Sequence, residues 1–328
     1  MINFDYVRMS STRSAIAALN KDPASQIIAG GTNLVDLMKR GIAAPRKIID
    51  INNLPLKNIE EVNGFIRIGA LALNSDVAEH ELIAKKLPLL SQALKSGASP
   101  QLRNMATIGG NMMQRTRCTY FYDTTMPCNK RHPGSGCGAL KGYNRMHAIF
   151  GASDNCIAVH PSDMSVALTA LDAIVLISSN KGDRRIPFGD FHRLPGNTPE
   201  KDNILQRGEL ITGIDVPDND ALIKNVFYLK IRDRASYAFA LVSVATALDI
   251  QGETIKDARL AMGGVAHKPW RLMPSESFLK GKRASVDTFK QAAAIAMEGA
   301  KGYGHNNFKL SLVPNAIVEA LKTAAAIT

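Results

Sequence analysis

The sequence lacks long apolar runs. Among its 328 residues, no stretch reaches the roughly 18 consecutive apolar residues that a membrane-spanning helix requires, so we expect no such helix. The first residues, MINFDY, include neither a basic nor an apolar segment, and we expect no signal peptide in this chain. Internal repeats and low-complexity tracts are also missing. With 45% apolar and 21% charged residues, the composition is that of a globular protein of about two domains.

Acidic residues are scarce in one part of the chain. Overall, 40 Lys and Arg residues against 29 Asp and Glu residues give a formal charge of +11, which raises the question of nucleic acid or another anionic partner. Between residues 103 and 147, however, seven basic residues accompany a single acid, Asp123. More than half of the excess charge is therefore local, and it requires a local explanation.

Recognisable catalytic arrangements are absent as well. The seven histidines form no H-x-x-x-H pair, and no Ser/His/Asp arrangement can be picked out. The residue pattern alone therefore identifies no catalytic residue.

Cysteine is confined to one region that overlaps the basic one. The four cysteines lie within 39 residues, at Cys118, Cys128, Cys137 and Cys156. Paired C-x2-4-C zinc ligands are missing, whereas two disulfides would suit an oxidising compartment. A [4Fe–4S] cluster with four thiolates would carry a charge of about −2, which the flanking Arg115, Arg117, Lys130 and Arg131 would offset. All three interpretations remain open, and the basic flank favours the cluster.

Hydrophobic periodicity predicts short strands and helices that alternate in the first half of the chain. The expected helices there are 15–19, 33–39, 76–83, 89–96 and 162–171, the last capped by Ser162. The expected strands are 26–28, 47–51, 65–70, 173–178 and 184–187. Residues 112–156 form a long loop, and loops of that length are usually functional.

The second half begins after a predicted linker, residues 215–220, which contains a proline and three acids. Apolar strands are expected at 226–231, 240–249 and 258–263. Two helices should follow, at 286–297 and 315–326, the second with Pro314 at its start.

Two loops each contain consecutive glycines with Thr and Asn: residues 29–33 and 107–111. The first follows a strand and opens a helix, an arrangement in which backbone N–H groups can face a phosphate. Neither loop is a Walker loop or a G-x-G-x-x-G motif. The pair would suit a dinucleotide, although two unrelated turns explain the pattern about as well.

In this order, the motifs resemble the FAD-binding subunits of the xanthine dehydrogenase family of molybdenum hydroxylases. Segments 28–34 and 101–111 are similar to the two loops that bind the flavin pyrophosphate in that family, and 161–163 to a Ser-Asp segment near the flavin. Further similar segments are 208–211, Lys230 with Arg234, and 263–271, so the likeness covers essentially the whole chain.

The resemblance implies an α+β fold and FAD as the cofactor. A two-lobed PCMH-type FAD-binding domain would span residues 1–218, and a C-terminal domain of antiparallel sheet plus helices would span 219–328. The implied FAD-binding residues are Gln26, Ile27, Ile28, Ala29, Gly30, Gly31, Thr32, Asn33, Leu34, Thr107, Gly110, Asn111, Gln114, Ser162, Asp163, Ile211 and Lys230.

The cysteine region resembles a branch of the family that carries an extra [4Fe–4S] cluster. The similar segments are 115–118, 127–131, 134–137 and 156–163. This implies that all four cysteines bind one cluster. The branch contains FAD subunits of periplasmic aldehyde oxidoreductases, the nearer likeness, and β subunits of 4-hydroxybenzoyl-CoA reductases, the alternative.

The function implied by the resemblance is electron transfer during the oxidation of aldehydes to carboxylic acids. Electrons would leave a molybdenum cofactor on a large subunit, pass [2Fe–2S] clusters on a small subunit, reach FAD on this chain and continue to an external acceptor. Tyr237 and Ala238 stand where NAD-reducing relatives carry acids, which weakens the case for NAD as the acceptor.

A heterotrimer, or its dimer, would be the working unit, without nucleic acid or membrane as partners. We expect export to the periplasm with a signal-bearing partner, and the cytoplasm is the alternative. The non-enzymatic alternative is a basic nucleic-acid-binding protein whose fold is stabilised by a metal bound to the cysteines.

Overall fold

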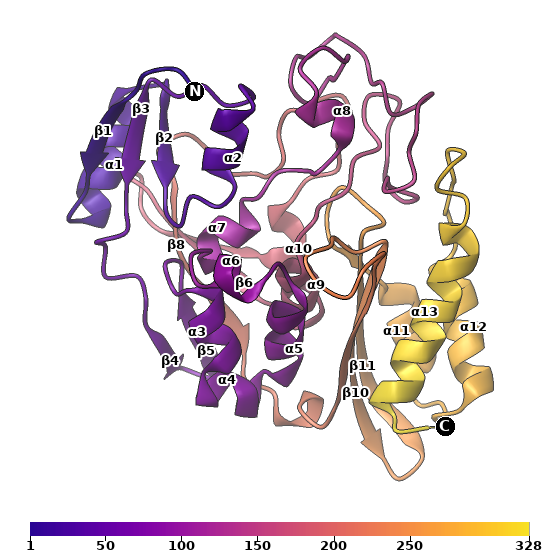
Figure 1. Cartoon of the computed structure of the whole chain (residues 1–328). Helices are drawn as coiled ribbons and strands as arrows, with labels where there is room; N and C mark the ends of the chain where they lie inside the picture. The colour runs from indigo at the N-terminus through magenta and orange to yellow at the C-terminus, as the bar shows by residue number, and fades with distance from the viewer. Residues whose placement is uncertain (328) are drawn as a thin grey trace.

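The computed structural model describes residues 1–327, in which three sheets follow one another from the N-terminal to the C-terminal part (Figure 1). The first sheet is parallel, with strand order β1-β3-β2. It consists of β1 (Asp5–Arg8), β2 (Ser25–Ile28) and β3 (Lys47–Asp50), connected by α1 (Thr12–Lys21) and α2 (Leu34–Lys39). The strands predicted near residues 26–28 and 47–51 are confirmed.

The second sheet has five antiparallel strands in the order β4-β5-β8-β6-β7. Its strands are β4 (Ile59–Val62), β5 (Phe65–Gly69), β6 (Ile174–Ser178), β7 (Arg184–Pro187) and β8 (Leu210–Pro217). The predicted linker at 215–220 is therefore wrong in its first half. Asp215 lies in the central strand, 1% exposed, and pairs with Arg67 at 2.7 Å and Arg185 at 2.8 Å. Because these neighbours neutralise it, an acid that is typical of a linker is part of the sheet.

Helices pack on this second sheet and close its core. They are α3 (Asn74–Glu79), α4 (Glu81–Lys86), α5 (Pro88–Ser96), α6 (Pro100–Arg103), α7 (Ile108–Met112), α9 (Asp163–Ala170) and α10 (Phe188–Phe191). The single helix predicted at 76–83 is wrong, because His80 is extended and interrupts it. Its Nδ1 accepts a hydrogen bond from the Leu82 N–H at 3.2 Å, which caps α4.

The third sheet is antiparallel, with order β12-β11-β10-β9, and helices cover both of its faces (Figure 1). Its strands are β9 (Asn225–Ile231), β10 (Val242–Gln251), β11 (Thr254–Gly263) and β12 (Trp270–Arg271), followed by α11 (Met273–Leu279), α12 (Val286–Ala296) and α13 (Lys309–Ala324). Ala245 and Ala247 face α5 and α9, whereas Val244 and Leu248 face the C-terminal helices. This architecture confirms the predicted α+β fold. A short helix η1 (Asp220–Leu222) lies between β8 and β9.

The last helix differs from its prediction. α13 begins at Lys309, so Pro314 lies inside it and not at its start. Lys309 is completely buried, and its Nζ donates to the carbonyl oxygens of His147 at 2.9 Å and Gly264 at 2.6 Å. These bonds hold the first turn of the helix against the sheet, and a proline so near the start removes only one helical hydrogen bond.

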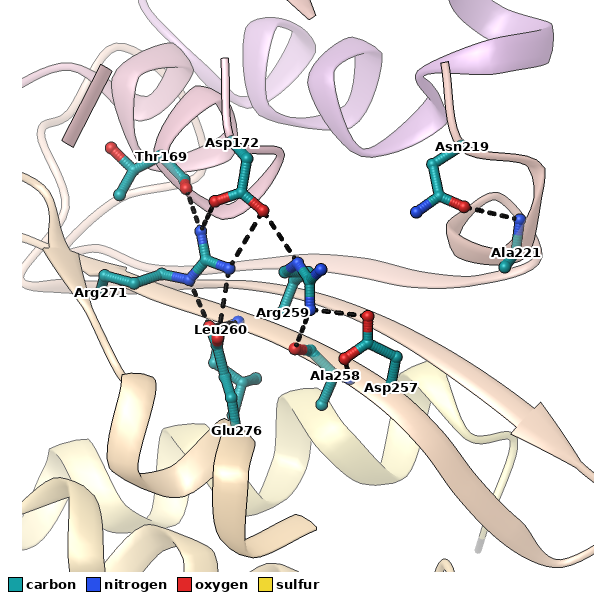
Figure 2. A network of polar contacts seen from close by, with 10 residues as sticks. All are labelled: Thr169, Asp172, Asn219, Ala221, Asp257, Ala258, Arg259, Leu260, Arg271 and Glu276. Carbon is teal, nitrogen blue, oxygen red and sulfur yellow. Dashed lines mark hydrogen bonds and ion pairs between the residues drawn. The ribbon is translucent and has the colours of Figure 1, made fainter. Parts of the chain in front are cut away.

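A polar network joins the end of α9 to the third sheet (Figure 2). Asp172 accepts hydrogen bonds from Nε of Arg259 at 2.9 Å and from Nη1 of Arg271 at 2.8 Å. Arg271 also pairs with Glu276 of α11 and donates to the carbonyl oxygen of Thr169. The network attaches the end of α9 to β11 and β12, so α9 has a set position relative to the C-terminal sheet.

The long loop between α7 and α9 crosses from the second sheet to the third. Within residues 113–162 it contains one short helix, α8 (Thr119–Tyr122), and two isolated bridges, Cys128 with Cys137 and Ser153 with Cys156. The predicted long loop is thus confirmed. No helix within residues 1–327 has the length and hydropathy needed to cross a membrane.

Candidate functional site

The first glycine loop lies between β2 and α2. Gln26, Ile27 and Ile28 belong to β2, Ala29 to Asn33 form the loop, and Leu34 begins α2. A Cβ on Gly30 would lie 1.7 Å from the carbonyl oxygen of Met105, so only glycine fits there. Because Met105 lies two residues before the second glycine loop, this contact brings the two loops side by side.

The second loop opens α7. Oγ1 of Thr107 accepts a hydrogen bond from the Gly110 N–H at 3.2 Å and caps this short helix. Oδ1 of Asn111 accepts from Nε2 of Gln114 and from Oγ of Ser162, both at 2.7 Å. The loop is thereby attached to the start of α9, which lies 51 residues further along the chain.

The start of α9 brings together the residues predicted from separate segments. Oγ of Ser162 accepts from the Ser165 N–H at 3.0 Å, which confirms Ser162 as the helix cap. Asp163 is buried, with Oδ1 2.8 Å from the Tyr228 hydroxyl and Oδ2 2.8 Å from Nζ of Lys230. Burial raises the pKa of the Asp163 carboxyl, while the Lys230 ammonium opposes that rise.

A cleft of about 200 Å³ opens beside Ser162 and Asp163, between the long loop and the third sheet. Tyr143 and Phe239, both partly exposed, stand at its rim. Its lining includes Arg117, Cys118, Arg145, His147, His160, Ser162, Asp163, Ser243, Gly263 and Gly264. The cleft therefore combines predicted flavin-side residues, cationic side chains and one cysteine. Ile211 lies apart, in the apolar core of the second sheet.

All four cysteines line one small pocket next to this cleft. Their sulfur atoms are unbonded, which argues against the disulfide interpretation. Within residues 1–327, no three or more His, Cys, Asp or Glu side chains are arranged to hold a metal ion, so the structure shows neither a preformed zinc site nor a preformed site for the predicted cluster. Burial raises the pKa of the Cys118 thiol to about 12 and that of Cys156 to about 11. The donor set, four thiols on a shared pocket, fits an iron–sulfur cluster in its chemistry.

The basic flank of the cysteines mainly anchors the loop. Lys130 is 1% exposed, and its ammonium contacts Asp202 and the carbonyl oxygen of Pro199. Nε of Arg115 also lies 2.7 Å from Asp202. Burial alone would raise the pKa of Asp202, but Lys130 and Arg115 hold it well below its usual range. Arg131 donates to three backbone carbonyls of the loop, those of Tyr120, Phe121 and Met126.

Three residues of this region were not predicted: Tyr228, Asp202 and His147. Tyr228 holds Asp163, and Asp202 pairs with Lys130. Nε2 of His147 lies 3.1 Å from Sγ of Cys118. None of them belongs to a spaced motif, so the sequence offered no signal for their roles.

Two protein families match the chain. Residues 2–219 match the FAD binding domain in molybdopterin dehydrogenase, and residues 227–324 match the CO dehydrogenase flavoprotein C-terminal domain. The chain is 47% identical to the aldehyde oxidoreductase FAD-binding subunit PaoB of Escherichia coli over 98% of each chain. It is 32% identical to the glyceraldehyde dehydrogenase medium chain of Sulfolobus acidocaldarius, over 89% of this chain and 86% of that one.

Solved structures show the same architecture. Carbon monoxide dehydrogenase from Hydrogenophaga pseudoflava superposes with a TM-score of 0.78 at 25% identity, over 99% of both chains. Quinoline 2-oxidoreductase from Pseudomonas putida 86 gives a TM-score of 0.76 at 25% identity, over 99% of this chain and 98% of that one.

Proposed function

The chain belongs to the FAD-binding subunits of the molybdenum hydroxylases, and on this premise we propose that it is the electron-transfer flavoprotein subunit of an aldehyde oxidoreductase. The observation that carries the proposal is the 47% identity to an aldehyde oxidoreductase subunit over 98% of both chains. A second relative of more than 30% identity also has an aldehyde in its name. The identity therefore favours aldehyde oxidation over the 4-hydroxybenzoyl-CoA reductase alternative, and the family favours a flavoprotein subunit over a nucleic-acid-binding protein.

FAD, when bound, supplies the redox chemistry that accepts and passes on electrons. The chain supplies position and electrostatics. The loops at 29–33 and 107–111 lie together and offer backbone N–H groups to a pyrophosphate. Asn111, Ser162, Asp163 and Lys230 connect the second loop to the cleft through direct hydrogen bonds. No residue of this chain is assigned a proton-transfer role, because substrate oxidation takes place on the partner subunit.

The partners in this proposal are a large molybdenum-cofactor subunit and a small [2Fe–2S] subunit, assembled as a heterotrimer or its dimer. Several relatives are named as a medium chain or medium subunit, which implies one larger and one smaller companion in those enzymes. This chain, at 328 residues, has a length similar to theirs.

The four cysteines bind one [4Fe–4S] cluster in this proposal. Four unbonded thiols line a shared pocket, which is the support for this proposal. Cluster irons are bound by thiolates at the corners of a unit larger than a single ion, so close convergence on one point is not required. Metal binding would also lower the raised thiol pKa values, since a coordinated thiol is deprotonated.

Export of the folded chain with a signal-bearing partner is the location we propose. Fractionation of cells with and without the leader of the large subunit tests it. A complex that stays wholly in the cytoplasm when the leader is present would contradict export.

The experiment that tests the function is purification of the chain co-expressed with both partner subunits. We expect about one FAD and four irons on this chain, and aldehyde-dependent bleaching of the flavin absorption. The control is the same complex treated with a substrate that is not an aldehyde, such as a purine. A complex that oxidises aldehydes without bound FAD, or contains FAD that aldehydes fail to reduce, would contradict the proposal.

A further inference from the structure

The wall between the cleft and the cysteine pocket consists of three residues that line both. They are Thr116, Cys118 and His147. Of the four cysteines, Cys118 is the one that borders the cleft. His147 is the imidazole in contact with it, with Nε2 3.1 Å from Sγ.

The backbone of His147 is fixed by hydrogen bonds, and its ring packs against Tyr120. Its backbone N–H donates to the carbonyl oxygen of Asn144 at 3.0 Å. Its carbonyl oxygen accepts from Nζ of Lys309 at 2.9 Å and from Nδ2 of Asn306 at 3.4 Å, and both donors are completely buried. The ring also lies against Tyr120, with centroids 6.3 Å apart. His147 is 4% exposed, so its ring has little freedom to turn away from Cys118.

We infer that His147 donates a hydrogen bond from Nε2 to the Cys118 thiolate and thereby raises the reduction potential of the cluster. The inference rests on the proposed [4Fe–4S] site. A thiolate bound to iron has no proton and can only accept, so Nε2 must carry the hydrogen. Nδ1 then holds a lone pair, and among residues 1–327 it has no hydrogen-bond partner. The contact with Cys118 is therefore the one polar contact of the ring.

A hydrogen bond to a ligating sulfur favours the reduced cluster. It draws negative charge away from the thiolate, and the reduced state has one more electron to stabilise. Because Cys118 borders the cleft that contains Ser162 and Asp163, the effect acts on the side of the cluster nearest the flavin-side residues. His147 is thus a positioning residue for electron transfer, although it holds no iron itself.

Redox titration of the intact three-subunit complex, followed by EPR, tests the inference. At the midpoint potential of the wild-type cluster, we expect His147→Leu to lower the ratio of reduced to oxidised cluster about tenfold, a shift of ~59 mV for a one-electron couple. His147→Gln should keep the ratio near the wild-type value, because its amide can donate from about the same position. His132→Leu removes an exposed imidazole of the same loop and serves as the control.

The outcomes separate this inference from the proposed function. A His147→Leu complex with a full-intensity [4Fe–4S] EPR signal and a wild-type potential overturns the inference and leaves the cluster in place. A wild-type complex whose iron is fully accounted for by the [2Fe–2S] subunit, with no [4Fe–4S] signal in EPR, overturns the cluster itself. If His147→Leu does not assemble, pulsed EPR of the reduced wild-type complex with 15N-labelled histidine decides the matter. A weak coupling to a histidine nitrogen supports the hydrogen bond, and the absence of any coupling overturns it.

Discussion

Nζ of Lys230 lies 2.8 Å from Oδ2 of Asp163, and this ion pair joins β9 of the C-terminal sheet to the first turn of α9. The two side chains are 4% and 7% exposed, so water contributes little to neutralising either charge. The Tyr228 hydroxyl completes the surroundings of the carboxylate at 2.8 Å. The pair therefore fixes the start of α9 relative to the third sheet, beside the cleft that Asp163 lines.

Lys230→Met should strongly destabilise the chain, because it leaves the Asp163 carboxylate buried and uncompensated. We expect the free energy of unfolding to fall by about 3–5 kcal/mol, the usual cost of breaking a buried pair on one side. Urea unfolding followed by circular dichroism measures it. The double variant Lys230→Met/Asp163→Asn should recover part of the loss.

The matched control for this variant is Lys95→Met. Lys95 pairs with Glu79 at 3.2 Å, but the two side chains are 47% and 71% exposed. Its loss should therefore change stability by less than about 1 kcal/mol. Equal stability of the Lys230 and Lys95 variants would contradict a stabilising role for the buried pair.

Gly30→Ala should abolish FAD binding while most of the fold is kept. The added Cβ would collide with the Met105 carbonyl oxygen at 1.7 Å, so the two glycine loops would have to separate. Measurement of FAD per chain in the purified complex checks this. Gly189→Ala, where an added Cβ meets no atom within 4 Å, should retain full FAD. A Gly30→Ala complex with normal FAD content would show that the loops do not line the flavin.

The local parts of the site could be predicted from sequence, whereas its tertiary contacts could not. A strand, two glycines and a helix follow one another within residues 25–39, so the first loop could be predicted from the residue pattern. That Gly30 touches Met105 depends on the packing of segments far apart in the chain. Residue spacing carries no information about such a contact.

The wrong linker prediction and the missed site residues have the same cause, since both depend on tertiary contacts. Asp215 resembles a linker residue until the arginines on neighbouring strands are placed beside it. Asp202 and His147 are single polar residues in loops, and their roles come from Lys130 and Cys118, which approach them only in the folded chain. The cysteine cluster was visible because all four members lie close together in sequence as well as in space.

Stability should fall as the pH drops from about 6.5 to 4. Burial lowers the pKa of His192 to about 4 and that of His267 to about 3, so both stay neutral in the folded chain in this range. In the unfolded chain they take up protons near pH 6.5, and each contributes a loss of about 1.4 kcal/mol per pH unit below that value. Urea unfolding at several pH values measures the slope.

Substitution of one buried histidine isolates its share of that slope. His267→Gln should reduce the pH dependence between about pH 6 and 5, where carboxylates of ordinary pKa are largely ionised. His305→Gln, at an exposed position, should leave the slope unchanged. A slope that is the same in the His267 variant and in the wild type would contradict the assignment.

Asp202→Asn should destabilise the cysteine loop and reduce its iron content. The carboxylate of Asp202 compensates both Lys130 and Arg115, and Lys130 is 1% exposed. Without this carboxylate the Lys130 ammonium is buried unpaired, at a cost of about 3–5 kcal/mol. We expect Lys130 to shift toward water and to displace Cys128, which lies two residues before it in the chain. We therefore expect iron per chain to fall below about half of the wild-type value, because metal-site binding and local folding are coupled.

Two further variants show whether the unpaired Lys130 charge causes the loss of iron in Asp202→Asn. Asp202→Asn/Lys130→Gln removes both charges and should restore most of the iron. Asp233→Asn breaks the pair with Arg145, whose side chains are 56% and 32% exposed, and should leave the iron content unchanged. Iron on this chain is measured as the iron of the purified complex minus that of its [2Fe–2S] clusters, together with the urea midpoint of the complex. An Asp202→Asn complex with full iron and normal stability would show that the cysteine loop is held by its other contacts, such as the bonds from Arg131 to its carbonyls.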